Sequence, residues 1–441
     1  MVTLYKPKQK AQHLGQQVKL QVESTDYEVN GIGRWQQKIA FVSGALAGEQ
    51  VLAKVTEDKA HFIKARVERV LKASPLRVTP FCPHYQLCGG CQLQHVASTE
   101  QARLKQQGVD ELIRHQTGLG ELPWQPLLTG PDQGYRRKAR IGVWFDRKRK
   151  QLTVGFRESA SKTLTPIKAC VVLQPQLQPI FAVLQQVVPQ LSEPSAITHV
   201  EVIAAEQQVF LIVRHIKPLT TAEQQLFVTA WPDAVWQGEA EAGQLTNWQP
   251  NAPSPRYRLS EQGLELAFAA TDFIQVNPQL NQQMVSLALQ WLQPQAEDNI
   301  LDLYAGMGNF SLALAQRAKL VHGVEGLATM VQQATANAQL NGITNTQFWQ
   351  ADLHLAWGKT DWNNPIYQKI VLDPARAGAE GAMPQLVKLK PAQILYISCN
   401  AATFARDAKV LLQSGYQLQK IAGIDMFPHT SHLELMALFS R

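Results

Sequence analysis

The sequence predicts an α/β protein with a Rossmann-like, doubly wound sheet at its carboxyl end. It also predicts a small OB-like β-barrel at the amino end and a β-rich region between the two. From about residue 266, short apolar segments alternate with helical ones, a pattern typical of a mostly parallel sheet. A glycine-rich turn over 302–310 connects one of these strands to a helix. Upstream, short β segments separated by Gly and Asn predict the barrel. We therefore expect three domains, over residues 1–74, 75–265 and 266–441.

The composition is that of a soluble globular protein. A chain of 441 residues is too long for one ordinary domain. The net charge of +7 favours a polyanionic partner. No apolar run is long enough to span a bilayer, and the first residues have no hydrophobic signal core. We therefore expect a cytoplasmic protein that does not associate with a membrane. Five cysteines in so long a chain predict reduced thiols rather than a disulfide framework.

The predicted barrel is basic. Val18, Leu20 and Val22 alternate on one face of its first strand, and Asn30–Gly33 is a turn signal. Its basic residues include Lys54, Lys59, Lys64, Arg66, Arg69 and Lys72. Small basic barrels often bind oligonucleotides, but a solvated charged surface explains this segment equally well. A helix over 98–116 follows, which can pack on the catalytic domain.

The carboxyl-terminal region contains seven expected strands. They are 299–303, 320–324, 347–350, 369–372, 393–397, 416–421 and 433–439. The turn after the first strand contains Gly306 and Gly308, which allow a ligand to approach the backbone. It lacks the third glycine of the dinucleotide fingerprint. Glu325 ends the second strand and can bind ribose hydroxyls, and Asp352 follows the third and can reach an adenine amine. This spacing fits S-adenosylmethionine at least as well as NAD, although each acid alone could cap a helix.

Gln275 lies in the segment Phe273-Ile-Gln-Val-Asn277, just before the sheet. Its amide could bind the amino-acid end of such a cofactor. A plain turn before a helix that starts at Pro278 is the alternative, because Pro is favoured at the first helical position.

Cys399 is the candidate nucleophile. It follows the apolar run Ile394–Ile397, and a cysteine at the carboxyl end of such a strand faces the ligand crevice. A buried core cysteine is the alternative. Asp373 ends the neighbouring strand, and Glu434 begins an apolar strand, where an acid is unusual unless it lies at an exposed edge. A thiolate, an acid and a methyl donor together indicate methylation of uracil at carbon 5, with a thiolate adding to carbon 6 and a base removing the carbon 5 proton. The target base must leave its stack.

Two further groups of residues predict a metal and an RNA. Cys82, Cys88 and Cys91 lie on one glycine-containing loop, and Cys170 is the remaining candidate for a fourth ligand of either zinc or a [4Fe–4S] cluster. Basic residues with interleaved aromatics, typical of phosphate contact and base stacking, occupy 135–150. The first basic cluster consists of Arg136, Arg137, Lys138 and Arg140. A charged hairpin in solvent is the alternative interpretation, but we predict that this cluster contacts RNA.

The chain resembles the RNA 5-methyluridine methyltransferases over nearly its whole length. The resemblance is carried by Ser398-Cys399-Asn400, Leu372-Asp-Pro-Ala-Arg-Ala-Gly378, Phe273-x-Gln275-Val-Asn277 and Phe427-Pro-His-Thr-x-His-x-Glu434. It implies that Cys399 is the nucleophile and Glu434 the base. The cofactor pocket it implies is lined by Gln275, Tyr304, Asn309, Glu325, Asp352 and Asp373. Ala401 stands where proline is usual, and we expect only a local effect on the loop.

The resemblance also selects the metal and the RNA. The family carries Cys-x5-Cys-Gly-Gly-Cys with a distant fourth cysteine, which implies a [4Fe–4S] cluster rather than zinc. The amino-terminal barrel resembles a TRAM domain, and barrel and cysteine cluster together imply a 23S ribosomal RNA substrate. Another uridine in ribosomal or transfer RNA is the runner-up, and a non-catalytic ribosome-assembly protein is the second hypothesis. We expect a monomer with no obligate protein partner.

Overall fold

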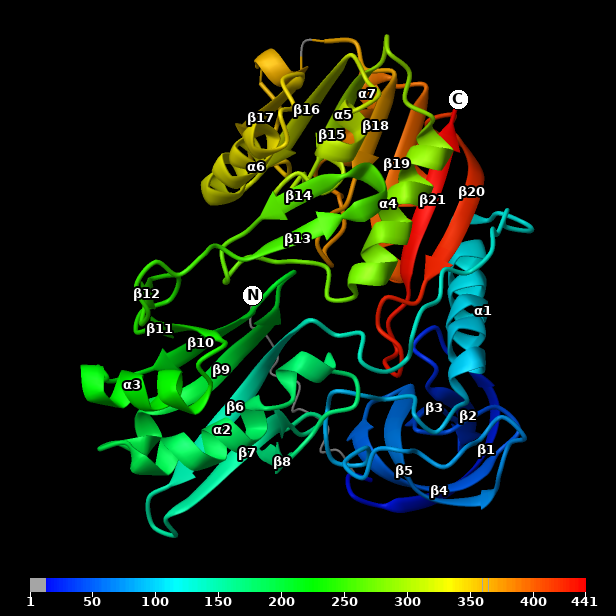
Figure 1. Ribbon diagram of the computed structural model, residues 1–441. Helices are drawn as coiled ribbons and strands as arrows, with labels where there is room; N and C mark the ends of the chain where they lie inside the picture. Colours follow the sequence, from blue (N-terminus) through cyan, green and yellow to red (C-terminus); the bar gives the residue numbers. More distant parts are fainter. Residues whose placement is uncertain (1–12, 359, 364) are drawn as a thin grey trace, which may run out of the picture. The chain divides into compact units, whose positions relative to one another are not determined.

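The computed structural model describes residues 13–358, 360–363 and 365–441, which form two compact units (Figure 1). The first unit comprises the residues up to Phe81 together with Cys91–Leu112 and His429–His432. The second comprises Cys82–Gly90, Ile113–Pro428 and Leu433–Arg441. The first twelve residues of the predicted barrel domain lie outside the described part. No described helix has both the length and the apolar character needed to cross a membrane.

The predicted amino-terminal barrel is confirmed as a closed, five-stranded barrel in the order β1-β2-β3-β5-β4. Its strands are β1 (Gln17–Thr25), β2 (Gly31–Trp35), β3 (Lys38–Ser43), β4 (Gln50–Asp58) and β5 (Phe62–Lys72). Buried and exposed residues alternate along β1, with Val18, Leu20 and Val22 in the barrel interior. The period of two places apolar side chains on one face of each strand, which closure then buries.

Helix α1 (Ser98–Thr117) follows the barrel in the chain. Gly108 lies in its middle, where glycine is normally unfavourable. A Cβ atom there would lie 2.6 Å from the Cα of Tyr27, so the close approach of backbone requires glycine. The buried side chain of Gln101 donates to the carbonyls of Leu93 and Val96 at 3.1 and 2.9 Å.

The central sheet has seven strands in the order β12-β11-β10-β9-β6-β7-β8. These are β6 (Lys138–Asp146), β7 (Gln151–Arg157), β8 (Leu164–Pro166), β9 (Ile197–Ala204), β10 (Val209–His215), β11 (Val235–Glu239) and β12 (Leu245–Asn247). Helices α2 (Ile180–Val187) and α3 (Thr221–Ala230) pack against it (Figure 1). Ile203 and Phe210 of the sheet share a core with Tyr257 and Leu280, so the central and carboxyl-terminal regions are packed together in the second unit.

A two-stranded hairpin, β13 (Arg256–Leu259) with β14 (Leu264–Ala267), leads to the carboxyl-terminal sheet. That sheet has the order β17-β16-β15-β18-β19-β21-β20. Its strands are β15 (Asn299–Leu303), β16 (Leu320–Glu325), β17 (Thr346–Gln350), β18 (Lys369–Leu372), β19 (Gln393–Ser398), β20 (Gln417–Ile424) and β21 (Glu434–Ser440). All seven predicted strands are confirmed. The first five are parallel, and β21 is antiparallel to both its neighbours.

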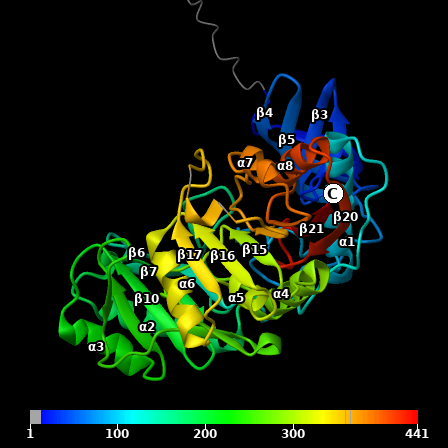
Figure 2. The same ribbon diagram turned by 90° about the horizontal axis from the view of Figure 1, so that it is seen from above.

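Five helices accompany this sheet: α4 (Pro278–Leu292), α5 (Ser311–Ala315), α6 (Ala328–Leu340), α7 (Met383–Leu389) and α8 (Ala401–Gln413). Helix α5 packs against β16, and α6 packs against β17 (Figure 2). The chain leaves β15 toward β16 and β17, then returns to β18 on the other side of β15. The strand order therefore reverses between β15 and β18, and ligands of open α/β sheets bind at the carboxyl ends of the strands at such a point.

Candidate active site

The predicted cofactor and reaction residues lie at the carboxyl ends of neighbouring strands. Tyr304 follows β15, Glu325 ends β16 and Asp373 follows β18. Cys399 follows β19, which pairs in parallel with β18. Because parallel strands end at the same edge of a sheet, the fold brings together residues that are up to 95 positions apart in the chain, from Tyr304 to Cys399.

The glycine-rich turn after β15 holds Glu325 through its backbone. The amide of Gly306 donates to Glu325 Oε2 at 3.1 Å, and the amide of Leu327 donates to Oε1 at 3.1 Å. Tyr304, Gly306 and Gly308 all have positive φ angles, of 62°, 55° and 96°. Such a φ costs little in glycine but is rare for a tyrosine, and strained residues of this kind cluster at functional sites. The hydroxyl of Tyr304 is buried and has no hydrogen-bond partner among the described residues.

Asn309 uses its side chain inside the protein. Its Oδ1 accepts from the Tyr257 hydroxyl at 2.9 Å and from Asn281 Nδ2 at 3.1 Å. Its Nδ2 donates to Asn281 Oδ1 at 3.1 Å. These bonds connect the end of the glycine-rich turn to α4 and β13. The side-chain amide of Asn309, for which a contact with the cofactor is predicted, therefore already braces the turn through these hydrogen bonds.

Asp352 is exposed and lies beyond the end of β17. Its Oδ1 accepts from the backbone amide of His354 at 2.9 Å, so its side chain closes a local turn. The rings of His354 and Tyr304 lie 6.3 Å apart between centroids. Burial raises the pKa of Tyr304, and so do the negative charges of Asp407, Asp352 and Glu325, so its phenol stays neutral near pH 7.

Asp302 is a buried site residue that sequence reasoning did not select. It lies within β15 and is fully buried. Its Oδ2 accepts from the Ser311 hydroxyl at 2.5 Å, whereas its Oδ1 has no partner among the described residues. Burial is the main cause that raises its pKa, to about 7, and the charge of Asp373 adds to it. The available signal was an acid inside an otherwise apolar strand.

Cys399 and Glu434 meet through the antiparallel pairing of β19 with β21. In that register Ser398 lies opposite Leu435, so one further step sets Cys399 opposite Glu434. Side chains that face each other across antiparallel strands have Cβ atoms about 5 Å apart. The strand pairing therefore places the predicted nucleophile beside the predicted base.

Glu434 is buried, with 5% of its surface exposed, and its Oε2 has no hydrogen-bond partner in the described part of the chain. Burial raises its pKa to about 8, with a further contribution from Asp373. Burial also raises the pKa of Asp373 to about 7. The pKa of the Cys399 thiol is raised by burial first and then by the charges of Glu434 and Asp373. Arg376 acts in the opposite direction on that thiol.

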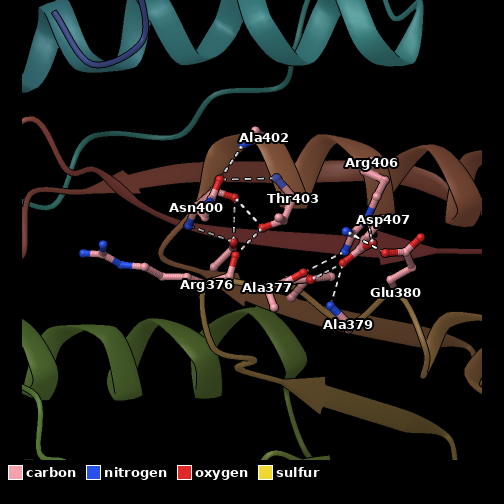
Figure 3. Close-up of polar contacts among 11 residues, drawn as sticks. Arg376, Ala377, Ala379, Glu380, Asn400, Ala402, Thr403, Arg406 and Asp407 are labelled. Carbon is pink, nitrogen blue, oxygen red and sulfur yellow. Dashed lines mark hydrogen bonds and ion pairs between the residues drawn. The ribbon is translucent and has the colours of Figure 1, made fainter. Parts of the chain in front are cut away.

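A network of hydrogen bonds fixes the loop after Asp373 against α8 (Figure 3). The buried carboxylate of Asp407 accepts from the Ala379 amide and from the Tyr396 hydroxyl, both at 2.7 Å. Tyr396 lies on β19, three residues before Cys399. Asp407 thus joins the loop that follows Asp373 to the strand that precedes Cys399.

The start of α8 fixes the residue that follows Cys399. The Asn400 side chain accepts from the amides of Ala402 and Thr403 at 3.0 and 3.3 Å, which caps the helix (Figure 3). The Thr403 hydroxyl donates to the carbonyl of Arg376 at 3.2 Å. Ala401, which stands where the family usually has proline, is the first residue of α8.

Gln275 lies between β14 and α4. Its Oε1 is buried and has no partner among the described residues. Asn277 caps α4, with its Oδ1 accepting from the Leu280 amide at 3.3 Å, and its Nδ2 likewise has no partner there. The alternative of a turn before a helix at Pro278 is also correct, because α4 begins at that proline. The turn leaves the Oε1 of Gln275 unpaired among the described residues, and the contact of Gln275 with a cofactor stays a prediction.

The predicted RNA residues divide into two kinds. Arg140 has 65% of its side chain exposed and donates to Glu201 at 3.0 Å, and Arg136 is partly exposed. Arg137 is only 4% exposed and donates through Nε to the Gln275 carbonyl at 2.7 Å. Lys138 donates through Nζ to two backbone carbonyls. A phosphate contact does not fit this placement of Arg137 and Lys138, because their donors point into the protein.

None of the five cysteines forms a disulfide, and all five are partly buried. Burial raises the pKa of Cys170, and the negative charges of Cys88 and Cys82 raise it further. The backbone amide of Gly90 donates to Cys88 Sγ at 3.4 Å. Among the residues that the structure describes, no three His, Cys, Asp or Glu side chains are grouped closely enough to hold a metal ion.

Two family models match parts of this chain. Residues 255–441 match the family model of tRNA (Uracil-5-)-methyltransferase, and residues 11–67 match that of the TRAM domain. The chain is 41% identical to the 23S rRNA (uracil(1939)-C(5))-methyltransferase RlmD of Photorhabdus laumondii, over 100% of both chains. It is 43% identical to the enzyme of the same name from Pectobacterium atrosepticum, over 95% of this chain and 92% of that relative.

A solved structure has the same fold over most of the chain. The crystal structure of Pyrococcus abyssi tRNA (uracil-54, C5)-methyltransferase, in complex with S-adenosyl-L-homocysteine, covers 95% of this chain and 100% of its own. The TM-score is 0.72 and the sequence identity 21%.

Proposed function

This chain belongs to the RNA (uracil-5-)-methyltransferase family, and from that premise we propose that it methylates carbon 5 of a uridine in 23S ribosomal RNA. The methyl donor is S-adenosylmethionine. The relatives act, by their names, on uracil 1939 of 23S rRNA, and the equivalent uridine is the proposed target. The observation that carries the proposal is the β19–β21 register, whose continuation by one step sets Cys399 opposite Glu434, with the charge of Asp373 acting on both groups.

The proposed reaction begins at Cys399. Its thiolate adds to carbon 6 of the uracil, and the electron pair of the carbon 5–carbon 6 bond forms an enolate. Carbon 5 then takes the methyl group from the sulfonium, which leaves as a neutral thioether. The target base must be out of its stack to reach the partly buried sulfur of Cys399.

Glu434 completes the proposed reaction as the general base. It removes the proton from carbon 5, the bond between sulfur and carbon 6 breaks, and the thiolate of Cys399 is released. This role is supported by the burial of the carboxyl, which raises its pKa to about 8, and by its Oε2, which has no hydrogen-bond partner among the described residues. A base whose pKa lies near the working pH combines a useful ionised fraction with strong proton affinity.

A cationic cofactor suits the electrostatics of the site. Asp302, Asp373 and Glu434 all have raised pKa values because burial leaves their charges uncompensated. A positive sulfonium beside them would favour their ionised forms. The residues proposed to bind the cofactor are Gln275, Tyr304, Asn309, Glu325, Asp352 and Asp373. The unpaired polar atoms of Gln275 and Tyr304 support this assignment, since buried polar groups are normally satisfied.

Arg136 and Arg140 are the proposed RNA contacts of the central domain. Their exposure and the net charge of +7 support electrostatic attraction to a polyanion. The TRAM barrel, with its basic strand β5, supplies a further proposed RNA surface.

We also propose that Cys82, Cys88, Cys91 and Cys170 hold a [4Fe–4S] cluster with a structural role. The spacing of the first three in the sequence supports it. The amide of Gly90, directed at Cys88 Sγ, is the kind of donor that stabilises a thiolate ligand. Iron and acid-labile sulfide analysis of protein purified without oxygen tests the cluster. Zinc in place of iron, or no metal, would contradict it.

The activity is tested with 23S rRNA from cells that lack this protein. Incubation with S-adenosylmethionine should produce 5-methyluridine at one position, mapped by nuclease digestion and mass spectrometry. With 5-fluorouridine RNA, a covalent adduct should persist on a denaturing gel, because fluorine cannot leave as a proton does. RNA binding with neither product nor adduct would favour the non-catalytic assembly role.

A further inference from the structure

We propose that Arg137 is a positioning residue for the cofactor site, which acts through Gln275, and that Lys138 assists it. These two consecutive basic residues begin the central sheet, yet their donors bind the segment 270–276 that connects β14 to α4. The inference rests on the proposed function, because it takes Gln275 to be a cofactor ligand.

Arg137 binds the Gln275 segment twice. Its Nε donates to the carbonyl of Gln275 at 2.7 Å, and its backbone amide donates to the carbonyl of Val276 at 2.9 Å. Its own carbonyl accepts from the Ala204 amide at 2.8 Å, which ties it to β9. The backbone of Gln275 is therefore held against the central sheet, while the side-chain oxygen of the same residue stays unpaired among the described residues.

Lys138 binds the other end of the same segment. Its Nζ donates to the carbonyls of Ala270 and Asp272 at 2.8 and 2.6 Å. Between the two anchored ends lies Phe273, which is 71% exposed and gains nothing from burial. The neighbouring Ala270 and Ile274 are buried in the core, so apolar packing and these hydrogen bonds together hold the segment in one conformation.

A second connection runs from Arg137 to the glycine-rich turn. Its guanidinium lies 4.6 Å from the centroid of the Tyr257 ring, in a cation–π contact. The hydroxyl of Tyr257 donates to Asn309 Oδ1 at 2.9 Å. One buried cation thus supports both the segment that carries Gln275 and the residue that ends the turn.

The cost of burying Arg137 argues that this arrangement has a function. The residue is 4% exposed, no ion pair with a carboxylate is found for it in the described part of the chain, and its Nη2 has no hydrogen-bond partner there. A buried charge without a paired carboxylate is expensive. Arg136 and Arg140, its neighbours in the same basic cluster, are more exposed. Within this one basic cluster, the exposed Arg136 and Arg140 are therefore assigned to RNA contact, and the buried Arg137 is assigned to positioning of the cofactor site.

The test is a double-mutant cycle on the affinity for S-adenosylmethionine, measured by calorimetry without RNA. Arg137→Met and Gln275→Ala should each raise the Kd, by about tenfold for Arg137→Met, which loses a charge-assisted hydrogen bond. The double variant should lose clearly less affinity than the sum of the two single losses, because Arg137 acts mainly through Gln275. Additive losses would show an independent structural role and overturn the proposal.

The controls separate positioning from folding and from RNA contact. Arg140→Ala should leave the Kd for the cofactor unchanged and weaken RNA binding, whereas Arg137→Met should do the reverse. The opposite pattern would contradict the proposal. If Arg137→Met does not fold, two milder variants replace it in the same cycle. Arg137→Lys keeps a cation at this position, and Lys138→Met keeps the hydrogen bonds of Arg137 to the segment. If the unchanged protein does not bind the cofactor at all, the proposed function fails first.

Discussion

Single residues in the site owe their chemistry to burial. Glu434, Asp373 and Asp302 are acids at the edge of an apolar sheet, and each has a pKa raised to about 7 or 8 because water is excluded. In water the same side chains ionise near pH 4. The site therefore contains carboxyl groups that change protonation state near neutral pH, whereas an acid on the surface is almost fully ionised there.

The raised pKa of Glu434 predicts a pH-dependent stability. The folded state keeps this proton up to about pH 8, whereas the unfolded chain loses it near the ordinary value of 4.5. Below pH 4.5 the contribution is fully present, and it is lost as the pH rises toward 8. Relative to Glu434→Gln, which cannot ionise, the unchanged protein should melt at a progressively lower temperature from pH 5 to pH 8. Parallel melting curves for the two proteins would show that Glu434 is not buried as an acid.

Glu434→Gln should also trap the proposed intermediate. Addition and methyl transfer need no base at this position, but elimination does, so a covalent complex with RNA should accumulate. A denaturing gel with labelled RNA measures it. Normal turnover of this variant would mean that another group removes the proton.

Cys399→Ala should abolish methylation while leaving cofactor binding nearly intact. The sulfur forms the proposed bond to carbon 6, and within the described part of the chain its side chain makes no hydrogen bond to the proposed cofactor residues. Activity with labelled S-adenosylmethionine and calorimetry with the cofactor measure the two effects separately. Equal loss of both would mark Cys399 as a structural residue.

At the scale of elements, the loop between β18 and α7 and the start of α8 act as one piece. Asp407 and Arg406 of α8 bind the amide of Ala379 and the carbonyl of Ala377, at 2.7 and 3.0 Å (Figure 3). Gly378 lies between the two with a φ of 75°. This close packing sets how the loop leaves Asp373.

Gly378→Ala should therefore disturb both stability and activity. A Cβ atom there would lie 2.6 Å from Arg406 Nη2 and 2.7 Å from Asp407 Oδ2, in addition to the strain of a positive φ. Gly415→Ala is the matched control, because Gly415 also has a positive φ, of 90°, but has open space around it. The control should lose about 1–2 kcal/mol of stability and keep activity, and Gly378→Ala should lose more of both. Denaturant unfolding measures the free energy of unfolding of both variants. Equal losses would show that the clash at Gly378 does not contribute.

The strands of the carboxyl-terminal sheet were predictable because each is a short apolar run next to a turn signal. β15 and β18 match their predicted ranges, and β20 extends three residues further than predicted. That extension depends on pairing with β21, which stabilises residues up to Ile424 that carry no separate local signal. Strand ends are set by the partner strand as much as by the strand itself.

At the scale of the whole molecule, net charge and exposed arginines should control RNA affinity. Arg140→Ala should weaken binding to 23S rRNA fragments and lower the slope of log K against log salt by about 1, as expected for one lost phosphate contact. Arg258→Ala is a matched control, since Arg258 is also an exposed strand residue paired with a carboxylate, Glu265, at 3.2 Å. Filter binding over a range of salt concentrations measures both. Identical slopes for the two variants would remove Arg140 from the RNA surface.

The sequence by itself determined the order of elements, the glycine-rich turn and the candidates Cys399 and Glu434, because these depend on periodicity and on residue type at strand ends. Only the tertiary structure decided that Arg137 and Lys138 turn inward and that Asn309 braces a turn. It also decided that the carboxyl group of Asp302 is buried, with one oxygen unpaired among the described residues. The physical reason is that the fate of a polar or charged side chain depends on which distant groups surround it. A run of basic residues such as 136–140 reads the same whether its donors meet phosphates or backbone carbonyls.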